Sequence, residues 1–487
     1  MSNQLETFLR ADYEKWRDRA YLHEKQDGEY KAITFGAFIE QVNYLAAYLL
    51  EHGYQGKTIG IFGANCTEWM IADIAIMNYV GVSAGLSKEW NYDNLVYALK
   101  KCEISCLFYH EGVSGLVERL REEYTDIRYI SMQQDFADCI EEGKKAGHKL
   151  FDLAAKDADA PAKIVFTSGT TSFPKAVLLS VRNVFAGWRS LGRRVPLCEN
   201  DVCYLFLPLN HTYGSIFNFI YSLVFGYEVY LAESVADMAQ EMMAVRPTVF
   251  SGVPIIYMRF YEGAKAAGIG LKDMFGGRMK YLFCGGAKLS ADVRNAYKAE
   301  GIYMMNAYAL SETASSFSID YPGEEDMESV GTVFEDMDVK VLDADAEGYG
   351  ELAAKGEGIF LGYYNEEEAT RNAFSEDGYF LTGDIGCIRD HKVYVRGRKD
   401  TTITLPNGEN VSTHLLEERV KGLHEGVAAV KVYVRNEQLT CDIYVDQKKT
   451  EGHMPDWDKL FEELNPTVPK YERIKKYTVY DSRNLLK

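Results

Sequence analysis

The stretch IVFTSGTTSFPKAVLL, residues Ile164 to Leu179, decides how the middle of this chain folds. It begins with the β-branched and aromatic run Ile164 to Phe166, which predicts a buried strand. A loop follows whose residues are small or carry hydroxyl groups: Thr167, Ser168, Gly169, Thr170, Thr171 and Ser172. One cation, Lys175, stands just after the loop, and an apolar segment comes next. Backbone N–H groups, hydroxyls and a lysine can together hold a polyphosphate, so we interpret this stretch as a phosphate-binding loop.

The loop is not the P-loop of the common nucleotide triphosphatases. That motif reads G-x-x-x-x-G-K-[ST], whereas Ala176 follows Lys175 here. A Ser/Thr-rich surface turn without a ligand is the alternative interpretation of the loop taken alone.

Length and composition describe a multidomain globular protein. The chain has 487 residues, which predicts two or three domains. A hydrophobic share of 47% and a charged share of 26% are ordinary for such a protein. The formal net charge of -19 argues against nucleic acid or an anionic membrane as the main partner. The nine cysteines are scattered and form no C-x-x-C pair, which favours a reducing, cytoplasmic location.

Strand and helix patterns alternate through the first 160 residues. Residues 5–20 and 34–51 have helical spacing, residues 58–65 and 105–109 read as buried strands, and residues 92–101 read as a helix. This alternation predicts an α/β fold with a doubly wound, largely parallel sheet. We expect no signal peptide and no membrane-spanning helix, because no long apolar run is present.

Six further motifs, taken in order, make the chain resemble the adenylate-forming superfamily, which includes acyl-CoA synthetases, luciferases and the adenylation domains of peptide synthetases. The phosphate loop resembles that family's TSGTTGxPKGV, with Ser172 and Ala176 where glycine is usual. The later motifs are LPLNH at 207–211, GGA at 285–287, AYALSE at 307–312, GEL through GYYN at 350–365, DGYFLTGD at 377–384 and RGR at 396–398.

The resemblance implies a role for each matching residue. Catalytic roles are implied for Lys175, for His211 beside the acid's carboxylate, and for Glu312, which with Thr171 would hold Mg²⁺. Nucleotide contacts are implied for Thr167, Ser168, Gly169, Thr170, Thr171, Gly286, Ala287, Lys288, Ala307, Tyr308, Ser311, Asp384 and Arg398. Tyr308 offers a flat face for adenine, and Asp384 can accept hydrogen bonds from both ribose hydroxyls. Taken alone, a histidine after an apolar strand, such as His211, is more often structural than catalytic, and a glutamate in a turn, such as Glu312, is usually a solvated charge.

The resemblance also implies the domain organisation. We expect a large N-terminal domain, residues 1–399, built of doubly wound sheets plus a β-rich subdomain. A small mobile α+β domain, residues 400–487, would follow a hinge at Asp400. The family's last motif carries a catalytic lysine, and the chain stops at Lys487. We expect that motif to be absent here, with Lys487 as its degenerate form as the alternative.

The activity implied is the ATP-dependent activation of a carboxylic acid to an acyl adenylate, followed by transfer to coenzyme A. The cofactors would be ATP, Mg²⁺ and coenzyme A. The sequence LPNGENVS at 405–412 is most similar to the fatty acyl-CoA ligases of the family and favours a fatty acid as the substrate. Two alternatives stay open: an acyl-AMP ligase that loads an acyl carrier protein, and a non-catalytic nucleotide-binding homologue. No nucleic-acid partner is expected.

Overall fold

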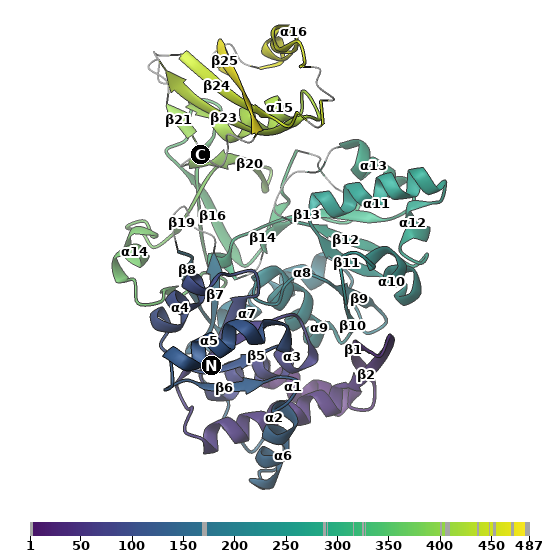
Figure 1. The fold of residues 1–487 in the computed structure, drawn as a ribbon, viewed down its shortest axis with the longest axis vertical. Coiled ribbons are helices and arrows are strands. Elements are labelled where there is room, and N and C mark those ends of the chain that lie inside the picture. The colour runs from purple at the N-terminus through teal and green to yellow at the C-terminus, as the bar shows by residue number, and fades with distance from the viewer. Residues whose placement is uncertain are drawn as a thin grey trace. The chain divides into compact units, whose positions relative to one another are not determined.

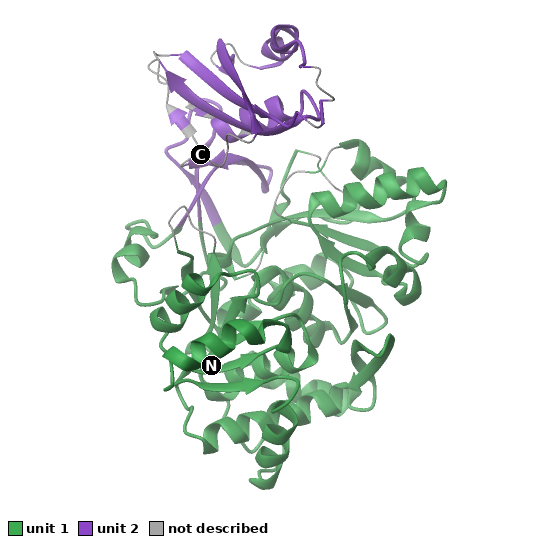
Figure 2. Cartoon of the chain, in the orientation of Figure 1, with its two compact units in different colours: residues 1–338, 354–380 green, residues 339–353, 381–487 purple. Residues whose placement is uncertain are grey.

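The computed structural model divides the chain into two compact units (Figure 2). Unit 1 comprises residues 1–338 and 354–380, and unit 2 comprises residues 339–353 and 381–487. The structure describes residues 3–167, 173–285, 289, 291–314, 316–323, 326, 328–399, 402–404, 410–435, 438–447, 449–450, 454–468 and 472–482. Asp400, where the sequence predicts the hinge, lies outside these residues, so a domain boundary there stays a prediction.

The first sheet of unit 1 contains the strands on both sides of the phosphate loop (Figure 1). Its strand order is β18-β8-β7-β4-β3-β5-β6. The bounds are β3 Thr58–Gly63, β4 Val82–Ser87, β5 Ile104–Tyr109, β6 Arg128–Ser131, β7 Pro161–Thr167, β8 Lys175–Ser180 and β18 Gly362–Tyr363. Strands β3 to β7 run parallel, whereas β8 is antiparallel to both β7 and β18.

In unit 1 a second sheet joins strands that are far apart in the sequence. Its order there is β15-β14-β13-β12-β11-β9-β10-β1-β2. The bounds are β1 Ala20–Gln26, β2 Glu29–Thr34, β9 Val202–Leu205, β10 Glu228–Leu231, β11 Val249–Gly252, β12 Tyr281–Cys284, β13 Tyr303–Ala309, β14 Ser316–Ile319 and β15 Thr332–Val333. The run from β13 to β1 is parallel, and β14, β15 and β2 are antiparallel additions.

Helices cover both faces of both sheets, in the arrangement that a doubly wound fold requires (Figure 1). The main core packs one face of each sheet against a shared helical layer: α1 Gln4–Trp16, α2 Phe35–Glu51, α3 Thr67–Ala75, η1 Ile76–Val80, α6 Phe136–Lys145, α7 Val181–Phe185, α8 Trp188–Arg194, η3 Tyr213–Ile220 and α9 Tyr221–Phe225. A second core lies under α4 Tyr92–Lys101 and α5 Ser114–Glu123, on the other face of the first sheet. A third lies under α10 Met238–Val245, α11 Pro254–Ala267, α12 Leu271–Met274 and α13 Ala291–Ala299, on the second. The expected α/β fold is confirmed.

A buried ion pair joins β7, the strand that leads into the phosphate loop, to helix α3. Lys163 Nζ lies 2.8 and 2.6 Å from the two carboxylate oxygens of Asp73, and both side chains are almost fully buried. Ser83 of the neighbouring strand β4 donates its hydroxyl to the same carboxylate at 2.6 Å. Because burying a charge without a partner is costly, these three groups fix the register of β7 against β4 and α3.

Unit 2 contains most of strands β16 Met337–Leu342, β17 Gly350–Gly356 and β19 Phe380–Arg389 and all of β20 Lys392–Arg398, which pair in the order β16-β17-β19-β20. The hairpin β21 Thr402–Thr404 and β22 Asn410–Ser412 follows. A three-stranded sheet of β23 Val427–Arg435, β24 Gln438–Val445 and β25 Lys476–Asp481 then packs with α15 Thr413–Lys421 and α16 Trp457–Leu464 around a separate apolar core. This part is the expected small α+β domain.

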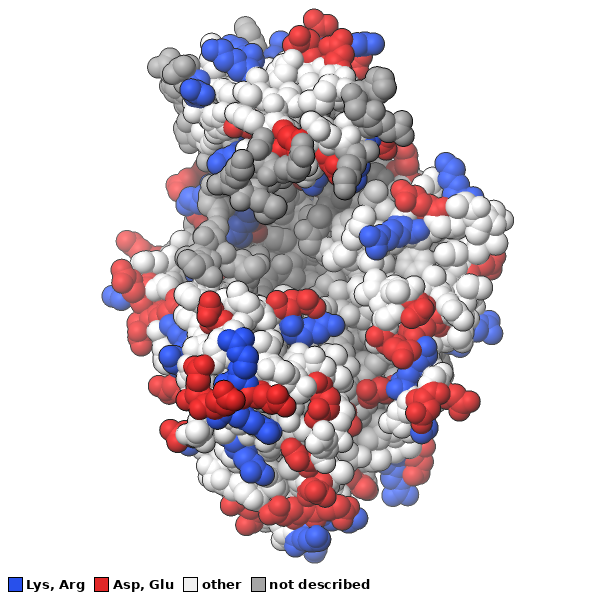
Figure 3. All heavy atoms as spheres, in the orientation of Figure 1, with Lys and Arg blue, Asp and Glu red and all other residues white. Residues whose placement is uncertain are grey.

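Charged side chains of both signs are interspersed over the described part of the face in Figure 3. None of the helices described is long and apolar enough to cross a membrane.

Candidate active site

The phosphate loop closes a β-hairpin whose two ends hold predicted site residues. Strands β7 and β8 pair so that Thr167 lies opposite Lys175. The β-branched residues before the loop and the apolar residues after it are buried, which anchors both ends of the hairpin in the sheet. Ser168, Gly169, Thr170 and Thr171 lie outside the described residues, so their nucleotide contacts stay a prediction. The structure therefore shows where the loop starts and where it ends.

The short strand β18 brings Tyr363 to the end of this hairpin. It pairs with β8, so that Gly362 lies opposite Leu178 and Tyr363 opposite Val177. The close approach depends on glycine at 362, because its φ is +141° and a Cβ would lie 2.7 Å from the Thr370 side chain. Lys175 Nζ then lies over the ring of Tyr363, 4.8 Å from its centroid, at cation–π distance.

Glu312 contacts the same tyrosine from another direction. It lies in the short 3₁₀ helix η4, Ser311–Thr313, which packs against β7 and β8. Its Oε1 accepts a hydrogen bond from the Tyr363 hydroxyl at 2.9 Å, and its carbonyl oxygen accepts one from Phe360 N at 2.9 Å. The structure thus brings Lys175 and Glu312, which are far apart in the sequence, to one side chain.

The two opposite charges at Tyr363 are not paired with each other. Among the residues that the structure describes, Lys175 has no ion-pair partner within 4.0 Å, and the Glu312 carboxylate has only the Tyr363 hydroxyl as a donor. A half-buried ammonium and a half-buried carboxylate that are left unpaired are suited to a ligand that carries both an anion and a hard cation. A metal chelated by phosphates is such a ligand.

His211 lies just before helix η3, in a segment that Asn65 holds in place. Asn65 donates to the Leu207 carbonyl oxygen at 2.9 Å and accepts from Leu209 N at 3.0 Å. The imidazole is exposed to water, yet desolvation by the surrounding protein lowers the pKa of His211. At neutral pH it is therefore an uncharged hydrogen-bonding group.

Tyr213 connects this segment to the end of β12. Its hydroxyl donates to the Phe283 carbonyl oxygen at 2.7 Å, and a Cβ on Gly285 would lie 3.1 Å from its ring. Gly286, Ala287 and Lys288, the expected adenine-binding turn, follow immediately but lie outside the described residues. Tyr213 therefore joins the histidine segment to Phe283 and Gly285 at the end of β12.

Ala307 and Tyr308 end strand β13, and Ser311 starts η4 just beyond it. Both side-chain positions at 307 and 308 are half-buried, and Tyr308 packs edge-to-face on Phe317 at 4.7 Å. A buried ion pair supports this end of the strand, since Asp320 bonds both Arg294 at 3.1 Å and Asn306 N at 2.9 Å. The strand end is thus held rigidly, which suits a residue that must present a flat ring.

Asp384 and Arg398 form a pair in unit 2. They lie opposite each other on β19 and β20, and Arg398 Nη1 is 3.2 Å from Asp384 Oδ1. The same guanidinium donates to the Thr382 carbonyl oxygen at 3.0 Å, and Asp384 N donates to the Thr382 hydroxyl at 3.1 Å. Gly383, whose φ is +70°, lies between Thr382 and Asp384 in β19. Their ribose contacts stay a prediction.

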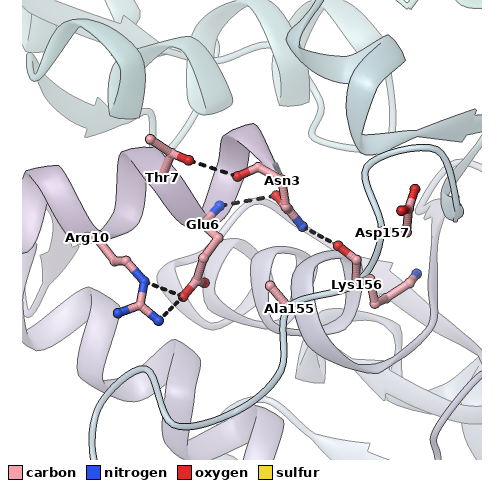
Figure 4. A pocket seen from close by; sticks show the side chains of 7 residues that line it. All are labelled: Asn3, Glu6, Thr7, Arg10, Ala155, Lys156 and Asp157. Atoms are coloured by element: carbon pink, nitrogen blue, oxygen red, sulfur yellow. Dashed lines mark hydrogen bonds and ion pairs between the residues drawn. The ribbon is translucent and has the colours of Figure 1, made fainter. Parts of the chain in front are cut away.

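A polar cavity of about 430 Å³ lies beside α1, and Figure 4 shows the side chains around it. Asn3 caps α1 and donates to the Lys156 carbonyl oxygen at 2.9 Å, while Arg10 pairs with Glu6 at 2.7 Å. The lining residues are Asn3, Glu6, Thr7, Arg10, Ala155, Lys156 and Asp157. Because its charges are balanced and largely engaged with protein groups, this cavity carries no comparable chemistry.

Sequence reasoning missed two residues of the site. Tyr363 belongs to the GYYN motif, but no site role was predicted for it. Tyr213 stands two residues after His211, and it was not among the predicted site residues either. No group of three or more His, Cys, Asp or Glu side chains that could hold a metal ion occurs among the described residues.

Doubly wound sheets, with a hydroxyl-rich loop after β7, Lys175 at the start of β8 and Glu312 in η4, are typical of a nucleotide-binding α/β protein. More closely, the chain belongs to the AMP-binding enzyme family, whose family model matches residues 9–364.

The chain is similar to long-chain fatty acid ligases. It is 24% identical over 477 residues to long-chain-fatty-acid–CoA ligase ACSBG2 of Xenopus laevis, an alignment that covers 84% of this chain and 64% of that protein. It is 26% identical over 464 residues to the peroxisomal long chain acyl-CoA synthetase 6 of Arabidopsis thaliana, covering 80% and 65%. The chain thus spans just under two thirds of the length of these curated relatives.

A solved structure shares the fold. ATP-bound MatB from Rhodopseudomonas palustris superposes with a TM-score of 0.83 at 22% identity, covering 100% of this chain and 98% of that one.

Proposed function

We propose that this protein activates a carboxylic acid with ATP and then transfers the acyl group to coenzyme A. In the first step a carboxylate oxygen attacks the α-phosphorus, a new P–O bond forms, and pyrophosphate leaves. In the second step the thiol sulfur attacks the acyl carbon, the C–O bond to AMP breaks, and the thiol proton passes to solvent. Family membership supports this proposal, and so does the meeting at one tyrosine of Lys175 and Glu312, which form no ion pair with the residues that the structure describes; the second observation carries the proposal.

The residues have distinct proposed roles. Lys175 would neutralise charge on the phosphate chain, and the hydroxyls and N–H groups of the loop would orient it. Glu312, with Thr171, would hold a Mg²⁺ ion, which supplies positive charge to the leaving pyrophosphate when bound. His211, kept neutral by its lowered pKa, would donate a hydrogen bond to the acid's carboxylate. Asp384 and Arg398 would bind the ribose.

We also propose a fatty acid as the substrate. The relatives named as long-chain fatty acid ligases and the LPNGENVS wording support this choice. A hinge at Asp400 would let the small domain rotate between the two steps.

The test is exchange of labelled pyrophosphate into ATP, measured with acids from acetate to palmitate and with benzoate and phenylacetate. We expect exchange with fatty acids, and thioester formation after coenzyme A is added. Glu312→Gln, which keeps the shape but removes the charge, should reduce exchange by about 10²-fold or more because the metal loses its carboxylate. If no acid in this panel supports the entry of labelled pyrophosphate into ATP, the adenylation step is contradicted. Acyl adenylate that persists in the presence of free coenzyme A would contradict only the acceptor.

A further inference from the structure

We propose that Tyr363 is a positioning residue that sets the geometry of both charges in the nucleotide site. This inference rests on the proposed function and adds a residue that acts through Lys175 and Glu312. Its hydroxyl orients the Glu312 carboxylate, and its ring face holds the Lys175 ammonium. One rigid side chain would thus fix the spacing between the cation that meets the phosphates and the carboxylate that meets the metal.

The ring of Tyr363 is itself held firmly. Its backbone N–H donates to Thr370 Oγ1 at 2.8 Å, and strand β18 pairs with β8 around it. Phe360 packs edge-to-face on the ring at 4.9 Å, and the same phenylalanine donates its N–H to the Glu312 carbonyl oxygen. The residue is 9% exposed, and its hydrogen bond to Glu312 is partly buried. A side chain so constrained can transmit its own position to the groups it contacts.

The Tyr363 hydroxyl donates a hydrogen bond that can orient the Glu312 carboxylate as a metal ligand. A neutral tyrosine donates one proton, and an ionised carboxylate only accepts, so the bond at 2.9 Å runs from Tyr363 to Glu312. It leaves the second carboxylate oxygen and the remaining lone pairs for a metal. Partners of this kind behind a metal ligand typically change metal affinity by about 10- to 100-fold when they are removed.

The ring also keeps the two charges available to the ligand. Lys175 and Glu312 contact different parts of one ring and, among the described residues, form no ion pair with each other. Without the ring, the flexible lysine side chain would be free to move toward the carboxylate. The two charges would then neutralise each other before the nucleotide arrived.

The test compares Tyr363→Phe with Tyr364→Phe as the matched control. Tyr364 is the next residue, and its hydroxyl makes no hydrogen bond to the residues that the structure describes. ATP binding is measured by calorimetry across a Mg²⁺ titration, without any acid substrate. We expect Tyr363→Phe to raise the Mg²⁺ concentration needed for half-maximal enhancement of ATP binding by about tenfold, with metal-free ATP affinity unchanged. Tyr364→Phe should behave like the wild type.

A second variant and a double-mutant cycle separate positioning from a general structural effect. Tyr363→Leu also removes the ring face, so metal-free ATP affinity should fall by about two- to tenfold, a loss that Tyr363→Phe does not show. In a Glu312→Gln background the effect of Tyr363→Phe on Mg²⁺ dependence should disappear, because the residue acts through that carboxylate.

The outcomes are distinct. If the wild type binds no ATP at any Mg²⁺ concentration, the proposed function fails. If the wild type shows Mg²⁺-dependent ATP binding and Tyr363→Phe matches it, the inference about Tyr363 is overturned while the proposed function stands. An unchanged effect of Tyr363→Phe in the Glu312→Gln background would also overturn it.

Discussion

Replacement of Lys175 with alanine is expected to slow pyrophosphate exchange by about 10²- to 10³-fold, because preorganised charge at a reacting phosphate is worth that much. Lys175 has no ion-pair partner among the described residues and contacts the Tyr363 ring, so its charge does little for the fold. Its removal should therefore leave the thermal unfolding midpoint nearly unchanged. A slower exchange rate at an unchanged unfolding midpoint would indicate that the Lys175 charge acts on the substrate and not on the fold.

Two variants sharpen this experiment. Lys175→Arg keeps the charge but changes its shape and reach, so an intermediate rate is expected. Lys31→Ala removes an exposed lysine of β2 and should leave the rate within twofold of the wild type. If Lys175→Ala retained more than a third of the wild-type rate, a role at the phosphates would be untenable.

The second large effect is expected at the buried pair of Lys163 and Asp73. Lys163→Met removes the cation and leaves a buried carboxylate with only the Ser83 hydroxyl and the surrounding backbone, at a cost of about 3–5 kcal/mol in the free energy of unfolding. Urea unfolding followed by tryptophan fluorescence would measure the loss. The site should suffer too, because β7 carries Thr167 to the loop.

The double variant Lys163→Met with Asp73→Leu is the control for this prediction. Replacing both charges by apolar groups of similar size removes the desolvation penalty, so most of the lost stability should return. Ser83→Ala should cost about 1.5–3 kcal/mol, the value of one hydrogen bond to a charged group. A double variant no more stable than Lys163→Met alone would mean that packing, not charge, explains the loss.

Local signals in the sequence predicted the fold well. Thr34 was expected to begin a helix, and its hydroxyl caps α2 by accepting from Ala37 N at 3.1 Å. Residues 92–101 form a helix with the expected bounds. Strand runs such as residues 58–65 were found because their apolar residues are continuous, as buried parallel strands require.

The misses came from contacts between distant parts of the chain. The helix expected over residues 5–20 ends at Trp16, because Phe35 N and Gly36 N bond the carbonyl oxygens of Arg19 and Arg17 and turn the chain into β1. Strand β1 then pairs with β10, some two hundred residues later. Residues Tyr213–Ile220 form a π-helix that continues into α9, Tyr221–Phe225, and no residue pattern indicated this change of helix type.

The candidate site, like the fold, could be predicted from the sequence only in part. The loop motif and the AYALSE motif identified Lys175 and Glu312 as residues of one site, since their residue types match the chemistry of a chelated phosphate. Their meeting at Tyr363 depends on the pairing of β18 with β8, which leaves no periodic signal in two residues of strand. The relation between the charges could be seen only in the folded chain.

The late position of β18 in the chain also affects the risk that the nascent chain aggregates during synthesis. Strand β8 has an apolar core and pairs with β7 on one side, and its other side is covered by the two residues of β18 together with the adjoining N–H groups of Leu361 and Tyr364. During synthesis those residues leave the ribosome long after β8 does. Until then β8 is an open sheet edge, the kind of surface on which nascent chains associate with one another. The residue that positions the charges thus belongs to the segment that ends this exposure, and full protection from aggregation would come only when the site is assembled.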